Sequence, residues 1–346
     1  MSNRPRMTKV GRLNHPSAGE HGEGTVIHLR VTSPPDITAL LVPQLRTNPA
    51  VLNLVVLPGA VSNPDGDALQ FDVIHAAAND VIDQLRELGL VERGSIILEN
   101  VDTSLATVAD RATAQQGRFH EFTPVWTEVE SRITLGGIYP PSWFALLVIA
   151  SLIGAVGILT NSQILVVGAM VVGPEYGAIL SLAYGVTRRD VARIRRGALA
   201  LVIGFSLAVV GSLILSLIVR AAGLAPEAYT LGVRPVSNLI DTPDWFSLIV
   251  AVLAGVVGVV SLSESRSSTL IGVFISVTTI PAASDIGLAL AFGSGKEAAG
   301  SLAQLLLNIT VLAAVAIAGL PAQRALWQRL AHRRVAAPVN LSGMEG

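Results

Sequence analysis

Two acidic residues of this 346-residue chain stand inside apolar stretches, where a carboxylate is costly unless it is paired, hydrated or neutralised. Glu175 follows Pro174, and Asp285 follows Pro281 and Ser284. In their ionised form such carboxylates would favour a cation. If the carboxyl groups are protonated, the free N–H groups at the helix N-termini would instead bind an anion or a polar neutral solute. Both chemistries remain open from the sequence.

Helix capping is the simpler explanation of the same residues. Pro174 predicts the first position of a new helix, where Glu175 in the first turn would offset the helix dipole. Ser284 and Asp285 likewise resemble an N-cap pair. Capping and ion binding both remain open for each acid alone. Because both acids stand within a turn of matching proline breaks, the pair favours ion binding.

Further polar residues accompany the two prolines. Gln304 and Asn308 lie one helical turn apart on one face, where hydrogen bonding between helices is the simpler explanation. Other secondary candidates are Ser162, Gln163, Thr278 and Thr279. The candidate substrate or ion site therefore comprises Glu175, Asp285, Pro174, Pro281, Ser284, Tyr176, Asn161 and Asn308.

The composition predicts that membrane helices position these residues. The chain is 51% hydrophobic and 14% charged, whereas soluble domains carry roughly 25% charged residues. Six apolar stretches have about the length that crosses a bilayer. They are Trp143–Thr160, Ile164–Gly185, Ala198–Ala221, Phe246–Leu262, Thr269–Phe292 and Ala299–Leu320. The fold class is therefore an α-helical polytopic membrane protein.

The six spans divide into two halves that resemble each other. GAILSLAYG (Gly177–Gly185) in the first half matches DIGLALAFG (Asp285–Gly293) in the second, and each follows a proline break. Three spans per half would make the halves run in opposite directions. Inverted repeats with broken helices are typical of secondary transporters. The match is short and rich in small residues, so chance similarity is the alternative.

Basic residues predict the orientation of the spans. One set of loops and ends holds Arg188, Arg189, Arg193, Arg195, Arg196, Arg266, Arg324, Arg329, Arg333 and Arg334. The opposite set holds Arg220, Arg234 and Lys296. We expect both termini on the cytoplasmic side of a prokaryotic inner membrane. The basic segment 323–346 would touch anionic membrane lipid, and we expect no nucleic-acid partner, because these arginines serve the membrane.

The first part of the chain predicts a small cytoplasmic domain. Residues 1–24 hold no apolar core and are expected to form a disordered tail. Residues 25–100 alternate between strand and helix patterns in the order βαββαβ, which is that of an α+β ferredoxin-like domain. Residues 101–141 form a connector with a partly amphipathic helix, which either lies at the membrane surface or simply packs. The membrane domain is expected over residues 142–322.

Several chemistries are not supported by the residues. The chain has no cysteine, which excludes disulfides and thiolate sites. It also has no HExxH, GxSxG or Walker motif, so we expect neither an enzyme nor a bound cofactor. Whether a metal binds stays open.

Two runs carry a family resemblance: ILTNSQILVVGAMVVGPEYG (Ile158–Gly177) and TIPAASDIGLALAFG (Thr279–Gly293). They resemble the DUF389 family of uncharacterised prokaryotic membrane proteins, and residues 135–320 match its general plan. A neutral amide is usual in the family at the position of Asp285, so the resemblance implies no family-wide role for that charge. It implies the architecture and no activity.

The sequence therefore predicts a secondary transporter or channel-like protein for an ion or small polar solute. Its cytoplasmic domain would regulate it or hold a homo-oligomer together. The alternative is a membrane sensor or scaffold that transports nothing, whose soluble domain binds a small ligand.

Overall fold

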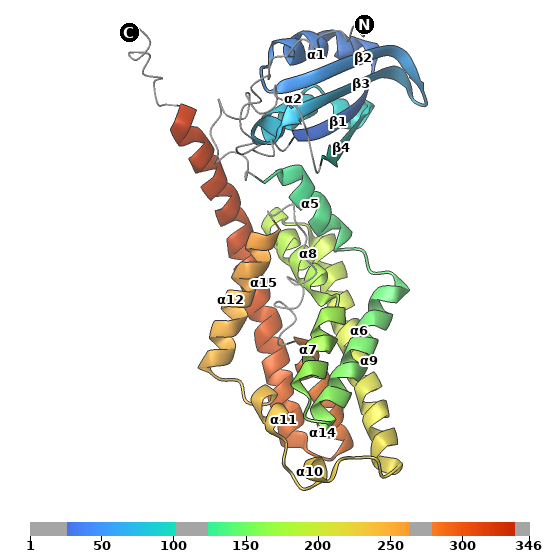
Figure 1. Ribbon diagram of the computed structural model, residues 1–346, viewed down its shortest axis with the longest axis vertical. Coiled ribbons are helices and arrows are strands. Elements are labelled where there is room, and N and C mark those ends of the chain that lie inside the picture. Colours follow the sequence, from blue (N-terminus) through green and yellow to red (C-terminus); the bar gives the residue numbers. More distant parts are fainter. Residues whose placement is uncertain (1–25, 102–123, 263–278, 336–346) are drawn as a thin grey trace, which may run out of the picture. The chain divides into compact units, whose positions relative to one another are not determined.

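The chain divides into two compact units, residues 1–123 and residues 124–346 (Figure 1). The structure, a computed structural model, describes residues 26–101, 124–262 and 279–335. The expected N-terminal tail and the end of the C-terminal segment lie outside the described residues.

The N-terminal unit is a four-stranded antiparallel sheet with two main helices. Its strands run in the order β2-β3-β1-β4. The elements are β1 (Val26–Ser33), α1 (Pro35–Thr47), β2 (Val51–Ser62), β3 (Asp65–Ile74), η1 (His75–Ala77), α2 (Ala78–Glu87), α3 (Leu90–Arg93) and β4 (Ser95–Asn100). Apart from the short η1 and α3, this is the element order that the sequence predicts.

Alternating side chains build the core of this unit. Leu69, Phe71 and Val73 of β3 are fully buried, because period-two alternation places them on one face of the sheet. Leu41 and Leu45 of α1 are buried as well. The helical spacing of Leu40 with Leu41 and Leu45 predicts that it also lies on the apolar face, but Leu40 is 59% exposed.

Strand β2 is longer than its sequence predicts. The Pro58-Gly59 pair predicts that the strand ends at Leu57, but β2 continues to Ser62. Its pairing with β3 shifts register between Leu57 and Val61, which leaves room for the proline. Because β2 is an edge strand, a residue without an N–H is tolerated there.

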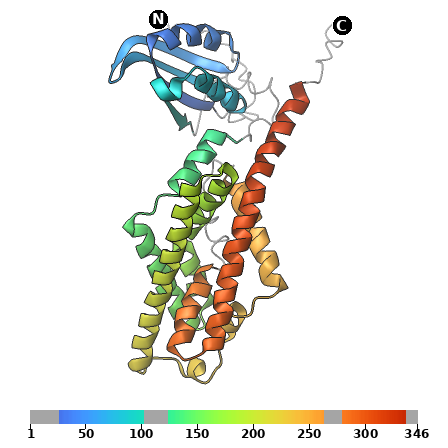
Figure 2. The ribbon, with the colours of Figure 1, turned by 180° about the vertical axis from the view of Figure 1, so that it is seen from behind.

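The second unit is helical (Figure 2). Its apolar helices include α6, α9 and α15, which are the longest, and the bent pair α7 and α8. The elements are α5 (Trp126–Leu135), α6 (Pro141–Leu159), α7 (Gln163–Val172), α8 (Glu175–Arg188), α9 (Val191–Ala221), α10 (Glu227–Thr230), α11 (Pro235–Ile240), α12 (Trp245–Ser261), α14 (Thr279–Ala291) and α15 (Gly295–Val335).

Three helices of the described chain, α6, α9 and α15, are long and apolar enough to cross a membrane. The bent pair α7–α8 would make a fourth span. Helices α12 and α14, with 17 and 13 residues, are apolar but shorter. The first ten residues of the span expected at Thr269–Phe292 lie outside the described residues. The number of six spans and the inverted repeat therefore stay predictions.

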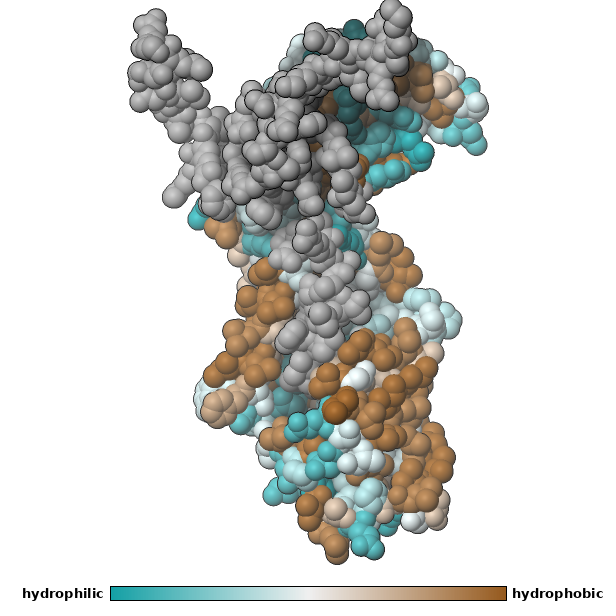
Figure 3. Space-filling model, in the orientation of Figure 1, coloured by the Kyte–Doolittle hydropathy of each residue, from teal (hydrophilic) through white to brown (hydrophobic). Residues whose placement is uncertain are grey.

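The surface of the helical unit indicates a membrane protein. Hydrophobic residues cover much of its visible face (Figure 3). Val202 and Ile218 of α9 are 65% and 60% exposed, and Leu253 of α12 is 59% exposed. Helix α9 has 31 residues and is roughly 46 Å long at 1.5 Å per residue. That length exceeds the hydrocarbon core of a bilayer, which is about 30 Å thick.

Small residues bring helices α6, α9 and α14 close together. The hydroxyl groups of Ser151 (α6) and Ser212 (α9) are 2.5 Å apart, and Ser284 (α14) donates to the Ser151 carbonyl at 3.0 Å. A Cβ on Gly287 would lie 2.6 Å from the Val209 carbonyl oxygen, so α14 and α9 are in backbone contact there. Such packing is typical of membrane helices.

Charged residues gather where α5 meets the helices. Val129 and Ile133 of α5 are buried against α8, α12 and α15. Glu130 of the same helix forms ion pairs with Arg188 of α8 and with Arg324 of α15. The basic C-terminal segment does not begin a separate helix, because α15 continues through Pro321 to Val335.

We predict that Gly287→Ala lowers the thermal stability of the protein, by roughly 1–3 kcal/mol, because the added methyl meets backbone atoms of α9. Gly168→Ala is the matched control, since nothing lies within 4 Å of a Cβ at this other helical glycine. Thermal unfolding of the two purified variants measures the difference. Equal melting temperatures would contradict the backbone contact.

Candidate functional site

The predicted break at Pro174 is present. Helices α7 and α8 meet at Gly173-Pro174 with a bend of 50°. Pro174 is the N-cap residue of α8 and Glu175 its first residue, which corrects the expected first position for the proline by one residue. The indole N–H of Trp143, on α6, donates to the Pro174 carbonyl oxygen at 3.2 Å. No sequence signal indicates this contact of Trp143, since only the fold brings it to the break.

Glu175 is buried at this break, with 1% of its surface exposed. The hydroxyl of Thr279 donates to Glu175 Oε1 at 2.6 Å. Thr279 is the first described residue of α14, so the bend in one predicted half meets the start of the helix in the other. A fully buried carboxylate held by a hydroxyl can exchange a proton or accept a cation if a path reaches it.

Asp285 is also fully buried and accepts two hydrogen bonds. Ser237 (α11) donates to its Oδ1 at 2.7 Å, and Ser301 (α15) donates to its Oδ2 at 2.6 Å. Neither serine was identified from the sequence. For Ser301 a signal existed, because it lies on the same helical face as Gln304 and Asn308, three and seven residues further on. For Ser237 the sequence offers no such signal.

The predicted capping role of Ser284 and Asp285 is wrong. Both residues lie inside α14, which as described begins at Thr279. The Ser284 hydroxyl donates to the Ile280 carbonyl one turn back and does not cap a helix end. Pro281 also lies within the described part of α14, three residues before Ser284.

Helix α14 carries the contacts of both acids. Thr279, which binds Glu175, precedes Asp285 by six residues, which is roughly 9 Å along the helix axis at 1.5 Å per residue. The carboxylate of Glu175, a residue of α8, therefore lies beside α14, the helix that carries Asp285. Of the residues of α14, only Leu290 is exposed, at 48%, so the helix is enclosed by the rest of the unit.

The remaining candidates occupy different surroundings. Asn161 is exposed in the turn between α6 and α7 with φ 53°, a left-handed conformation that asparagine tolerates, and is not part of the buried site. Tyr176 points its hydroxyl at Gly258 of α12, where it leaves no room for a Cβ. Asn308 is fully buried and accepts a hydrogen bond from Gln304 Nε2 at 3.2 Å, a bond within α15.

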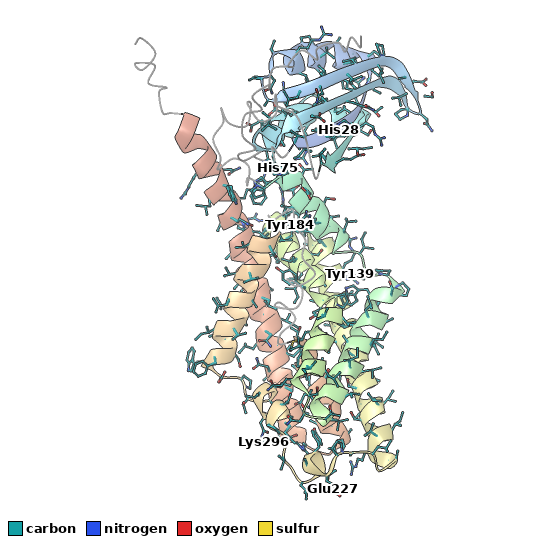
Figure 4. The ribbon with its side chains drawn as sticks, in the orientation of Figure 1. His28, His75, Tyr139, Tyr184, Glu227 and Lys296 are labelled. Carbon is teal, nitrogen blue, oxygen red and sulfur yellow. The ribbon has the colours of Figure 1, made fainter. Side chains whose placement is uncertain are left out.

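Acidic and basic groups surround the Asp285 side of the unit. The charges that act on Asp285 are those of Asp241 and Glu297, both acidic. Arg234 binds Glu297 at 2.5 Å and lies 4.3 Å from the ring centre of Tyr229. Burial raises the pKa of Asp241, and the charge of Glu297 raises it further. Figure 4 shows Lys296 and Glu227 at this end and Tyr184 at the other end of the unit.

No metal centre is present among the described residues, since no group of three or more His, Asp or Glu side chains could hold an ion. The arrangement supports binding of a proton or small cation by isolated carboxylates with hydroxyl neighbours. It does not resemble a paired acid and base poised for hydrolysis.

The fold and these buried groups define a helical membrane protein. Residues 170–314 match the family described as a domain of unknown function (DUF389), which confirms the resemblance carried by the two motifs. The matched stretch includes the break at Pro174, Glu175 and Asp285.

A curated relative is an uncharacterized protein of Methanocaldococcus jannaschii, 22% identical over 167 residues. The alignment covers 48% of this chain and 49% of the relative, so the chain spans about half the length of that protein. No solved structure matches the chain.

We predict that Thr279→Val destabilises the protein by roughly 1–3 kcal/mol, because it removes a hydroxyl donor from a buried carboxylate without changing the side-chain shape. Thr279→Ser keeps the hydroxyl and serves as the control. Thermal unfolding at neutral pH compares them. A valine variant as stable as the serine variant would show that this hydrogen bond contributes nothing.

We predict that Asp241→Asn raises the melting temperature at neutral pH. Because the pKa of Asp241 is raised in the folded protein, its protonation favours folding below the ordinary pKa. That stabilisation is lost as pH rises through the folded pKa. The advantage of the asparagine variant should therefore shrink toward zero as the pH falls to about 4. A difference that is constant between pH 4 and 7 would contradict the prediction.

Proposed function

We propose that this protein is a secondary transporter or channel-like protein that moves an ion or small polar solute through its helical unit. The observation that carries the proposal is Asp285, a fully buried carboxylate on an apolar helix. Its hydrogen bonds come from two serine hydroxyls, and no ion pair joins it to a basic side chain of the described residues.

A carboxylate in this position has two stable states. It is neutral when protonated, or it is compensated by a bound cation, because an uncompensated charge in an apolar interior is costly. The nearby carboxyl group of Asp241 adds to the preference for a positive ligand, whereas Glu297 is paired with Arg234. Glu175, bound to Thr279 at the other end of α14, offers a second position of the same chemistry.

The bend at Pro174 supports the proposal from the backbone. Broken helices near the middle of a membrane protein release N–H and C=O groups that can line a solute path. Movement at the bend would change which side of the membrane reaches Glu175, while α14 carries the second carboxylate. Alternating access needs such a flexible joint between packed helices.

The same proposal includes the location and orientation of the chain. It places the protein in a prokaryotic cytoplasmic membrane, with both termini in the cytoplasm. Arg188 and Arg324 support this orientation, because both bind Glu130 and so lie at one end of the helical unit. The N-terminal unit would regulate transport or hold a homo-oligomer together.

We predict that Glu175→Gln and Asp285→Asn each reduce ion flux at least tenfold. The amides keep the side-chain size and can exchange hydrogen bonds with the serine and threonine hydroxyls, but they cannot take up a charge-compensating proton or cation. The protein is reconstituted in liposomes with an internal pH-sensitive dye. Proton, Na⁺ and K⁺ gradients are imposed in turn, and empty liposomes give the background.

Glu227→Gln is the matched control, since Glu227 is an exposed acid of the same unit (Figure 4). It should transport like the wild type. Carboxylate variants that transport like the wild type would overturn the role of the two acids. A wild-type protein that never exceeds empty liposomes would overturn ion transport itself and favour the sensor or scaffold alternative.

A further inference from the structure

Helix α9 exposes an apolar stripe along one face. Its residues recur every three or four positions, which places them on the same side of a helix. From Leu199 to Ile218 the stripe is roughly 29 Å long at 1.5 Å per residue. The hydrocarbon core of a bilayer is about 30 Å thick, so the stripe has the length that faces acyl chains. Its members are Leu199, Ile203, Leu207, Val210, Ile214 and Ile218, all exposed.

Arg196 stands at one end of this stripe. It precedes Leu199 by three residues and Ile203 by seven, so it lies on the same face of α9. Its side chain is exposed, and its Nε donates to the Ala192 carbonyl at 3.3 Å. Within the described ranges, no carboxylate pairs with it. A guanidinium group just beyond a stripe of this length lies at the depth of the lipid phosphate groups.

Arg193 brings a second positive charge to the same place. Its Nη2 donates to Thr134 Oγ1 of α5 at 3.4 Å, and its Nε lies 3.7 Å from Asp190 Oδ2. The charges of Arg193 and Arg196 both act on the hydroxyl of Tyr139, in the linker between α5 and α6 (Figure 4). The two guanidinium groups therefore lie together beside this linker, and Asp190 compensates one of the two charges.

The linker adds exposed apolar side chains next to these charges. Leu135 and Ile138 are 64% and 60% exposed, and they closely follow Thr134, which binds Arg193. A soluble anion would gain nothing from apolar surroundings. A phospholipid carries a phosphate group and acyl chains in one molecule, so it matches both the unpaired charge and the apolar surface beside it.

We propose that Arg196 and Arg193 bind the headgroup of an anionic phospholipid whose acyl chain lies along the exposed stripe of α9. Their excess positive charge favours an anionic headgroup over a zwitterionic one, whose own cation offsets the phosphate charge. The proposal requires the helical unit to lie in a membrane, but it does not depend on ion transport. Lipid binding and flux are measured separately, so each proposal can fail without the other.

Contact quenching by brominated lipids tests the site in the full-length protein in phosphatidylcholine nanodiscs. The chain has no cysteine, so a single introduced cysteine can carry a bimane label. Ile203→Cys places the label roughly 10 Å along α9 from Arg196, level with the acyl chain of a lipid bound there. Leu253→Cys, at an exposed position of α12, reports the bulk lipid. Phosphatidylglycerol or phosphatidylcholine with brominated acyl chains is then titrated in.

At the Ile203 position, brominated phosphatidylglycerol should reach half-maximal quenching at a mole fraction about fivefold lower than brominated phosphatidylcholine. At the Leu253 position the two lipids should quench alike. Equal quenching by both lipids at the Ile203 position would overturn the proposal. Absence of quenching there by either lipid would overturn it as well, because the stripe would then not face acyl chains.

Arg196→Gln should remove most of the preference for phosphatidylglycerol, whereas Arg196→Lys should retain it because the charge remains. Arg195→Gln is the matched control, since Arg195 is an exposed arginine of the same helix, about 100° around the axis from Arg196. This control should keep the preference of the parent protein. An equal loss in both glutamine variants would show that any positive charge at this end attracts the lipid, and would overturn the assigned site.

Inorganic phosphate distinguishes the lipid from a soluble anion. An excess of phosphate, added at constant ionic strength, should leave quenching by brominated phosphatidylglycerol unchanged, because phosphate gains nothing from the apolar stripe. Displacement of the lipid by phosphate would assign the two arginines to a soluble anion and overturn the proposal.

Discussion

Burial of the Asp285 carboxylate is the constraint on which much of the helical unit depends. A carboxylate enclosed by apolar helices needs donors at both oxygens, and Ser237 and Ser301 provide them from α11 and α15. These two bonds fix three helices relative to one another. Any movement of α11 or α15 away from α14 would leave a buried acceptor unpaired, so these bonds stabilise the contacts among the three helices. The carboxyl group can still gain or lose a proton.

Close contacts with α9 and α6 also hold α14 in place. Gly287 brings the helix into backbone contact with α9, and Ser284 binds the backbone of α6 at Ser151. In a bilayer the hydrophobic effect does not drive helices together, so van der Waals contact and hydrogen bonds do this work. Protein and not lipid surrounds nearly all of the described part of helix α14.

Within one turn, residues of helix α15 contact two chemically different environments. Ser301 faces the carboxylate of Asp285, and Gln304 lines an open, mainly apolar pocket between α7, α11, α12, α14 and α15. Pro281 lines the same pocket one turn before Asp285 on α14. The carboxylate and the apolar pocket therefore contact the same two helices.

The sequence by itself determined the local elements and their burial. Alternation predicted β1 and β3, apolar runs predicted α6, α9 and much of α15, and Pro174 predicted the bend beside Glu175. These features depend on short-range periodicity and on the missing N–H of proline, which the chain carries in its residues. Two motifs added the resemblance to the DUF389 family, which the family match confirms over residues 170–314.

Only the tertiary structure decided which side chains meet. Thr279 lies 104 residues from Glu175, and Ser237 lies 48 residues from Asp285, so no spacing rule links them. Ser284 and Asp285 were expected to cap a helix from their types, but they lie inside α14. There Ser284 binds α6, and Asp285 accepts hydrogen bonds from α11 and α15. Residue types indicated which groups would be costly to bury, but long-range packing alone selected the hydroxyls that make their burial possible.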